Sequence, residues 1–216
     1  MNKTFPILAI ETSSELCSVA LIFNEKKFSE INFLDKHVHS ESLMIFIDKL
    51  LEISKLKISE IKSIAVSSGP GSFTGIRIGY SAAKGIAFGL NLPIIPVPTF
   101  SAFAMELASF LGVGKSFCIA VKASSSDLYF GEYEVTAEQV LEKIPVQLIN
   151  TSDLTIYANT KNVFSDFLSN VTIQNYLPKA NFIGKWAANF GEQVKTFEYD
   201  FIEPNYLKKF IPKVKK

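Results

Sequence analysis

The chain has 216 residues, of which 48% are apolar, 12% aromatic and 20% charged. This low charge and high aromatic content exclude a disordered or fibrous protein, and the length predicts one large domain or two small lobes. The 22 basic and 21 acidic residues give a net charge of +1. A protein-wide electrostatic surface for nucleic acid is therefore excluded.

The basic charge is concentrated at the C-terminus. Five lysines lie among the last nine residues, at Lys208, Lys209, Lys213, Lys215 and Lys216. Any contact with a polyanion is expected through this tail rather than through the body of the protein.

The sequence shows no targeting or membrane signal. Its first apolar run, ILAI, is too short for a signal peptide, and no stretch of about 18 uninterrupted apolar residues occurs. Cys17 and Cys118 each lie in an apolar run without the spacing of a metal or redox pair, so both are expected to be buried free thiols. We expect a cytoplasmic protein with no membrane contact.

The first half of the chain alternates apolar strand-like runs with amphipathic segments. In chain order the pattern predicts three strands, a helix, a strand, a helix, a strand and a helix, at residues 5–10, 16–23, 27–34, 40–53, 63–67, 75–90, 93–97 and 99–111. Ser40 is the expected N-cap of the first helix, whose buried face would carry Leu43, Ile47, Leu50 and Leu51. This order is typical of an α/β protein with a mixed sheet covered by helices.

The opening pattern restarts near Phe117. A buried strand, a Ser-rich turn and a second strand recur, with Lys122 in the place that Glu11 holds in the first copy. Further strands are predicted at 127–135 and 139–150, and helices at 165–169 and 178–194. We therefore expect two related lobes, residues 1–100 and 101–216, that share a packed interface.

The segment GPGSFTGIRIG, residues 69–79, is the most informative motif. Its glycines and proline form a tight turn that delivers backbone N–H groups to the start of a helix. Such a helix start can bind an anion, with Ser72, Thr74 and Arg77 as candidate contacts. The motif lacks the Lys-Ser/Thr ending of a P-loop. A purely structural strand-to-helix turn is the alternative interpretation, and both stay open.

Small residues recur every four positions along the helix that follows. Gly75, Gly79, Ala83 and Ala87 would share one face, and such a face allows another backbone to approach closely. The face would pack either on the chain's own sheet or on a helix of another subunit. Arg77, the only arginine, lies in the first turn of this helix, where a carboxylate or phosphate partner is expected.

Candidate catalytic groups are few. His37 and His39 form an H-x-H pattern without further ligands in evident spacing, so no metal site is expected. They are the only histidines, which disfavours nucleophilic hydrolysis. A phosphotransferase would use Glu11 together with a second carboxylate, but Lys122 stands in the second place.

Four stretches carry a family resemblance: ILAIETSSELCSVAL at 7–21, HSESLM at 39–44, GPGSFTGIRIGYSAAKGIAFG at 69–89 and EPNYLKKF at 203–210. With them the sequence resembles the TsaB (YeaZ) family, the non-catalytic subunits of bacterial threonylcarbamoyladenosine synthesis on tRNA. The resemblance spans essentially the full length and implies an actin-like fold with two related lobes.

The same resemblance implies partners and a site. The chain would be a pseudoenzyme scaffold that activates a TsaD-like catalytic paralogue, with a TsaE-like ATPase as third member and tRNA contacted indirectly. ATP and metal would be bound by those partner subunits. For the chain alone the resemblance allows a homodimer, and the choice between monomer and homodimer stays open. The partner interface would lie on the two helices of the first lobe, with the candidate residues Leu43, Ile47, Gly75, Arg77, Gly79, Tyr80 and Ala83.

One departure from the family pattern concerns the second hairpin, where Lys122-Ala123-Ser124 replaces the usual Asp-Ala-Arg. The loss of both charges argues against nucleotide binding by this hairpin. The alternative function is a free-standing actin-like ATPase or small-molecule kinase that uses Glu11 and the loop 69–75.

Overall fold

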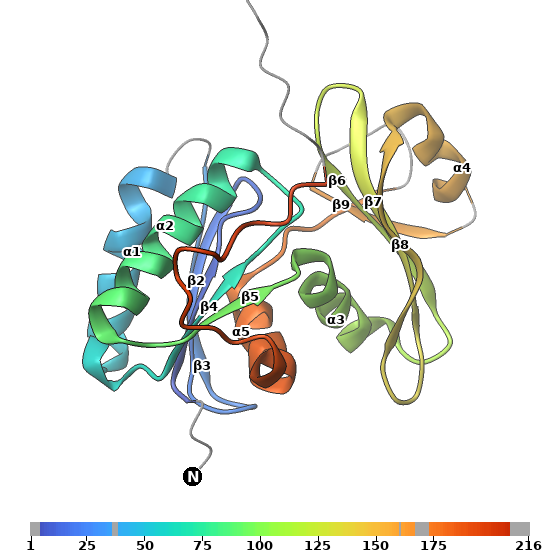
Figure 1. The fold of residues 1–216 in the computed structure, drawn as a ribbon. Helices are drawn as coiled ribbons and strands as arrows, with labels where there is room; N and C mark the ends of the chain where they lie inside the picture. Colours follow the sequence, from blue (N-terminus) through green and yellow to red (C-terminus); the bar gives the residue numbers. More distant parts are fainter. Residues whose placement is uncertain (1–4, 36–38, 160, 167–172, 208–216) are drawn as a thin grey trace, which may run out of the picture.

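The computed structural model describes residues 5–35, 39–159, 161–166 and 173–207. His37 and the lysine-rich tail lie outside these ranges, so their roles stay predictions. Two β-sheets face each other, and the helices α3 (Thr99–Leu111) and α5 (Ala180–Phe190) lie between them (Figure 1).

The first sheet has the strand order β3-β2-β1-β4-β5. Its strands are β1 (Ile7–Glu11), β2 (Leu16–Ile22), β3 (Phe28–Leu34), β4 (Ser63–Ser67) and β5 (Ile94–Val97). Strands β1, β2 and β3 pair antiparallel as a meander, whereas β4 and β5 run parallel to β1. Strands β2, β3, β4 and β5 lie within their predicted segments, and β1 extends one residue beyond its segment, to Glu11. Strands β1, β2 and β4 are fully buried, which produces the apolar runs seen in the sequence, whereas β3 is partly exposed and alternates polar with apolar residues.

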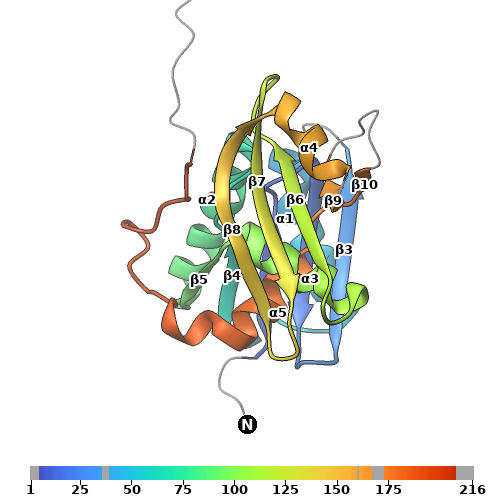
Figure 2. The same cartoon turned by 90° about the vertical axis from the view of Figure 1, so that its right-hand side faces the viewer.

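The second sheet repeats this topology. It has the order β8-β7-β6-β9-β10, again with three antiparallel strands followed by two parallel ones (Figure 2). Its strands are β6 (Ser116–Lys122), β7 (Asp127–Val135), β8 (Val140–Asn150), β9 (Asn162–Ser165) and β10 (Ile173–Asn175). Two lobes with the same unusual strand order are the mark of an actin-like α/β fold, and that prediction is confirmed.

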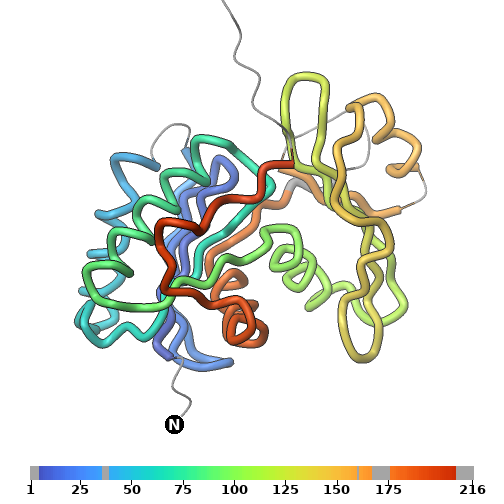
Figure 3. Tube along the Cα trace, viewed as in Figure 1, coloured from blue at the N-terminus to red at the C-terminus, as the bar shows by residue number. Residues whose placement is uncertain are grey.

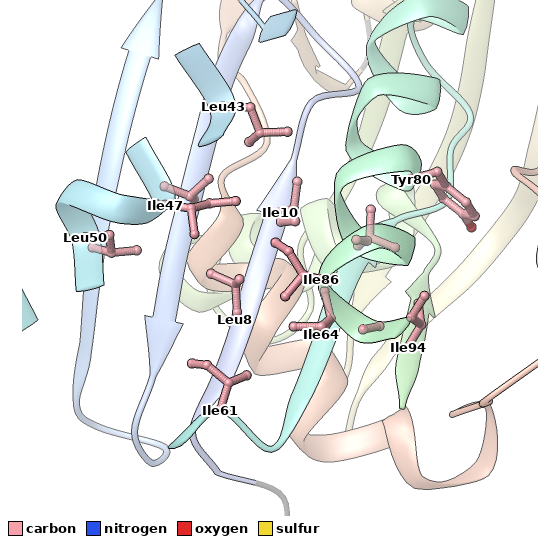
Figure 4. Close-up of a cluster of buried hydrophobic side chains, with 14 of the residues drawn as sticks. Leu8, Ile10, Leu43, Ile47, Leu50, Ile61, Ile64, Tyr80, Ile86 and Ile94 are labelled. Carbon is pink, nitrogen blue, oxygen red and sulfur yellow. The ribbon is translucent and has the colours of Figure 1, made fainter. Parts of the chain in front are cut away.

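Helices α1 (His39–Ser54) and α2 (Phe73–Leu90) cover the outer face of the first sheet. Successive residues of β1 point to opposite faces. Leu8 and Ile10 therefore meet Leu43 and Ile47 of α1 in one apolar cluster, which Figure 4 shows. Helix α2 ends at Asn91, whose φ of 51° is the left-handed conformation of a helix C-cap.

Helix α5 covers the inner face of the first sheet. Ala180, Ile183 and Ala187 pack against Ile7 and Ala9 of β1. A Cβ on Gly184 of α5 would lie 2.3 Å from Cγ1 of Ile22, so helix and sheet are in close contact. Helix α5, from the second half of the chain, thus lies against the first sheet, which the predicted division at residue 100 does not describe.

Several helix predictions need correction. Ser40 is not the N-cap, because α1 already begins at His39. The predicted helix at 165–169 is wrong at Ser165, which ends strand β9, and residues 167–169 lie outside the described ranges. The short helix α4 (Leu154–Ala158) was not predicted, and α5 begins two residues after Pro178.

Two simpler expectations concern burial and membranes. Cys17 and Cys118 are both buried free thiols, as predicted, and burial raises the pKa of Cys17 to about 11. Within the described ranges no helix combines the length and apolarity needed to cross a bilayer.

Candidate partner-binding site

The start of α2 is docked on the turn between β1 and β2. Thr12 Oγ1 donates to the carbonyl oxygen of Gly75 at 2.8 Å, and the N–H of Ser72 donates to the carbonyl oxygen of Ser13 at 2.7 Å. Ser72 is the N-cap, and its Oγ accepts the N–H of Gly75 at 3.2 Å.

The glycines of the motif are required by this close approach. A Cβ would lie 2.5 Å from the Ser13 carbonyl oxygen at Gly71, 2.0 Å from the Thr12 carbonyl oxygen at Gly75, and 2.4 Å from Thr12 Oγ1 at Gly79. The small-residue face of α2 therefore packs on the chain's own hairpin and sheet. Gly75, Gly79 and Ala83 are buried in this packing, so they add no accessible surface in the chain alone, and their role in a partner interface stays a prediction.

Contacts within the chain account for part of the hydrogen bonding of the loop at residues 69–75, as expected for a structural strand-to-helix turn. The N–H groups of Ser72 and Gly75 are both taken by acceptors within the chain. Thr74 is exposed in the first turn of α2. An anion contact by Ser72, Thr74 or Arg77 stays a prediction.

Arg77 contacts aromatic residues rather than the expected carboxylate. Its Nε donates to the hydroxyl of Tyr206 at 3.0 Å, and its guanidinium carbon lies 4.0 Å from the ring centroid of Phe73. The rings of Phe73 and Tyr206 are 5.0 Å apart. The two rings and the guanidinium thus form one small cluster at the start of α2.

Tyr206 belongs to a segment, residues 195–207, that we call the C-terminal strap. The strap runs beside α2 along the first lobe (Figure 3). It is fixed by the Tyr199 hydroxyl, which donates to the Leu92 carbonyl at 2.9 Å, and by the Asn205 N–H, which donates to the Ser68 carbonyl at 2.7 Å. The strap also covers Tyr80, which is only 4% exposed.

An open groove lies between α1 and α2 on the outer face of the first lobe. Its volume is about 510 Å³. Most of its lining is apolar, with Arg77 on the rim, and includes Leu43, Met44, Phe73, Ile78 and Ala82. Met44 is 45% exposed and so is accessible to an occupant of the groove. The α1–α2 groove is thus an apolar, accessible surface built from the two helices of the predicted interface.

The groove contains only some of the predicted interface residues. Leu43 and Arg77 line it, as does Thr74. Ile47 is fully buried in the core of the lobe and Tyr80 lies under the strap, so neither reaches the groove.

The groove is also lined by residues that were not predicted from the sequence, namely Met44, Ile78, Ser81 and Ala82. The four-residue spacing of a helix could have identified Ile78 and Ala82 as lining residues. Thr74, Ile78 and Ala82 follow each other at four-residue spacing, one position before the buried face that carries the small residues.

Glu11 is buried at the end of β1. It is 0% exposed, and its Oε1 accepts the N–H of Ser13 at 2.5 Å. Burial raises the pKa of Glu11 to about 7, and the nearby carboxylate of Glu106 adds to the shift. Oε2 of Glu11 has no hydrogen-bond partner among the described residues. This carboxyl is enclosed by protein and does not open onto the α1–α2 groove.

The second hairpin is held together by its own residues. The N–H of Lys122 donates to Asp166 at 3.0 Å, and Ser124 Oγ donates to Asp127 at 2.7 Å. His39 is likewise structural, since its Nε2 lies 2.9 Å from the carbonyl oxygen of Ser14. No group of three His, Cys, Asp or Glu side chains suited to a metal ion occurs in the part of the chain that the structure describes.

The fold defines the class of protein: a two-lobed actin-like chain whose first lobe carries an accessible groove between two helices. Comparison with known sequences gives the family. A family model described as TsaD, tRNA N6-adenosine threonylcarbamoyltransferase, matches residues 34–207. The chain belongs to this family and, within it, to the TsaB (YeaZ) members.

That assignment rests on curated relatives named tRNA threonylcarbamoyladenosine biosynthesis protein TsaB. The Haemophilus influenzae protein is 36% identical over 164 residues, which is 68% of each chain. The Bacillus subtilis protein is 28% identical over 218 residues, which is 94% of this chain and 93% of the relative. A solved structure titled YeaZ from Pseudomonas aeruginosa has a TM-score of 0.76 at 23% identity, and covers 93% of this chain and 99% of that one.

The chain is also similar to proteins that carry the name of the family model, TsaD. A Staphylococcus epidermidis tRNA N6-adenosine threonylcarbamoyltransferase is 36% identical over 113 residues, which is 45% of this chain and 33% of the relative. The similarity to this enzyme therefore covers only part of each of the two chains. The similarity to the Bacillus subtilis relative covers nearly the whole length of both chains.

Proposed function

We propose that the chain is a non-catalytic subunit in the synthesis of threonylcarbamoyladenosine on tRNA, and that it acts by binding a TsaD-like catalytic paralogue. The observation that carries the proposal is the accessible apolar groove between α1 and α2 in a member of the TsaB family. An apolar surface of this kind is typical of a protein–protein interface.

The shape of the groove supports a helical occupant. Two neighbouring helices with exposed Met44 and half-buried Ile78 between them provide a hydrophobic channel. An amphipathic helix binds such a channel by inserting side chains at three- and four-residue spacing. Arg77 at the rim, stacked on Phe73, supplies a cation for an acidic residue beside that helix.

The buried carboxyl supports a non-catalytic role. A phosphotransferase needs an accessible carboxylate in its cleft. Glu11 is enclosed and holds its proton up to about pH 7. The equivalent position in the second lobe is a lysine, Lys122, whose backbone is bonded to Asp166. These features fit a scaffold better than an enzyme.

Activation by a scaffold requires differential binding. The chain can raise the partner's activity only by as much as it binds the competent conformation of the partner more tightly than the resting one. In this proposal the partner subunits bind ATP, metal and tRNA, a TsaE-like ATPase completes the assembly, and two copies of this chain pair when the paralogue is absent.

The decisive experiment measures the modified nucleoside in cells. Depletion of this chain should remove threonylcarbamoyladenosine from bulk tRNA, as seen by mass spectrometry of the nucleosides. Re-expression of the natural sequence should restore it. Persistence of the modified nucleoside after complete depletion would overturn the proposal.

A matched pair of variants tests the groove. Met44→Glu places a carboxylate in the apolar channel and should abolish both co-purification with the TsaD-like paralogue and rescue of the nucleoside. Ile45→Glu is the control, because Ile45 is 56% exposed on the same helix and does not line the groove. Equal rescue by both variants would remove the groove from the proposal.

A separate measurement tests the rival ATPase function. Calorimetric titration of the isolated chain with magnesium and ATP should show no binding. Saturable binding that Glu11→Gln abolishes would instead support the ATPase.

A further inference from the structure

A second cavity lies away from the α1–α2 groove. Its volume is about 700 Å³, within the range of small-molecule sites. It forms where α3, the β7–β8 hairpin and the end of α5 come together, elements that Figures 1 and 2 show next to one another. We call it the hairpin pocket.

Aromatic and polarisable side chains are part of the lining of the hairpin pocket. Trp186 and Phe190 of α5 line it, with ring centroids 5.4 Å apart and planes inclined at 48°. Met105 of α3 and the largely buried Tyr133 of β7 also line it. Tyr133 is held in place by stacking on Phe117, at 5.6 Å between centroids. The electron-rich faces of such rings attract cations.

The charged side chains that line the hairpin pocket are acidic. Glu138 and Glu142 line the pocket from the hairpin, and no Lys, Arg or His is found in its lining as far as the structure describes it. The chain as a whole carries slightly more basic than acidic residues. The pocket is thus locally negative within a protein that is close to neutral.

The two pocket glutamates differ from their neighbours on the same hairpin. Glu134 pairs with Lys143 at 3.0 Å, and Glu132 pairs with Lys161 at 2.5 Å. Glu142 instead accepts a long hydrogen bond of 3.5 Å from the Tyr133 hydroxyl. Its negative charge is therefore available to a ligand in the pocket.

From this combination we propose that the hairpin pocket binds a small organic cation with an apolar body, such as an arylalkyl ammonium. The ammonium group lies beside Glu142 and the apolar body lies on the rings of Trp186 and Phe190. Glu138 and Glu142 are both exposed, and their negative charge disfavours an anion in the pocket. This site is independent of the partner-binding proposal.

Trp186 provides a direct test because it is the only tryptophan of the chain. Its fluorescence is followed while the full-length protein is titrated with phenethylamine at neutral pH. A saturable change is expected, with the neutral isostere 2-phenylethanol binding about two- to fivefold more weakly, as the loss of one exposed charge contact implies.

Two hairpin variants serve as a matched pair. Glu142→Gln should weaken phenethylamine binding by about two- to fivefold, whereas Glu134→Gln should leave it unchanged, because Glu134 pairs with Lys143 and does not line the pocket. No saturation, equal binding of both isosteres, or equal effects of both variants would overturn the proposal. Tighter binding of Nα-acetyl-lysine amide would assign the pocket to a basic protein side chain and would overturn it too.

Discussion

Thr12 and Gly75 lie 63 residues apart in the sequence and are joined by a hydrogen bond of 2.8 Å from the threonine hydroxyl to the glycine carbonyl. The acceptor lies in the first turn of α2, so the β1–β2 turn holds the helix by its backbone. The same hydroxyl lies 2.4 Å from where a Cβ on Gly79 would be. Close contact with Thr12 therefore explains why positions 75 and 79 of the GPGSFTGIRIG motif are glycine.

The first prediction follows from this contact. Gly79→Ala should destabilise the fold by about 1–3 kcal/mol, because the added methyl group must push α2 away from Thr12. Urea unfolding of the isolated chain measures the change. Gly85→Ala in the same helix is the control, since its Cβ would meet nothing within 4 Å. It should be neutral or stabilising by up to about 1 kcal/mol.

The outcome separates two roles for the small-residue face. A stable Gly79→Ala variant that has lost only its partner would contradict the internal packing seen here and restore this face as an interface.

The second prediction concerns the strap. Tyr206→Ala should lower the unfolding free energy by about 1–2 kcal/mol, because it removes both the ring contact with Phe73 and the hydrogen bond from Arg77. Tyr206→Phe removes only the hydroxyl and should cost about half as much or less. Thermal unfolding of the three proteins checks the order.

Phe201→Ala is the matched control for the strap, because Phe201 is 82% exposed in the same segment. Its unfolding temperature should equal that of the natural sequence. An equal loss for Tyr206→Ala and Phe201→Ala would show that the cluster around Arg77 does not stabilise the strap.

The third prediction is a pH dependence that arises from Glu11. Its pKa is about 7 in the folded chain, against 4.5 for an ordinary glutamate. Between these values the unfolded chain releases the proton first, so the unfolding free energy should fall as the pH rises from about 4.5 to about 7. Glu11→Gln removes this loss and should stabilise the protein at pH 8 on the order of 2–3 kcal/mol.

Glu106, whose pKa burial also raises to about 7, should retain part of the slope in that variant. The replacement of the exposed Glu25 by Gln is the control and should leave the pH profile unchanged. A Glu11→Gln profile identical to that of the natural sequence would show that Glu11 titrates normally in the folded chain.

Local pattern predicted most of the elements but not their contacts. Strands β1, β2, β4 and β5 of the first sheet are mainly apolar runs, and β3 alternates polar with apolar residues, so their positions follow from the sequence alone. Strand β9 and helix α4, by contrast, have four and five residues, too few to establish a period. The packing of α5 on the first sheet depends on Ala180, Gly184 and Ala187, whose small size is informative only once Ile22 is known to face them.

The same limit applies to the candidate site. Of the predicted interface residues, Leu43 and Arg77 line the groove between the two helices, whereas Gly75 and Gly79 are buried against the chain's own hairpin. The side of α2 that faces the hairpin could not be identified, because the residue that contacts it, Thr12, lies far away in the sequence. Met44 was overlooked because it stands next to the buried stripe rather than on it.

The position of α5 has a consequence for how the protein is made. The inner face of the first sheet, with Ile7 and Ala9, is covered only when Ala180 and Ile183 arrive. At about 5–20 residues per second, the ribosome needs on the order of ten seconds to add the stretch between β5 and α5. During that time the nascent first lobe exposes an apolar sheet face, which makes it a natural client for a chaperone near the tunnel exit.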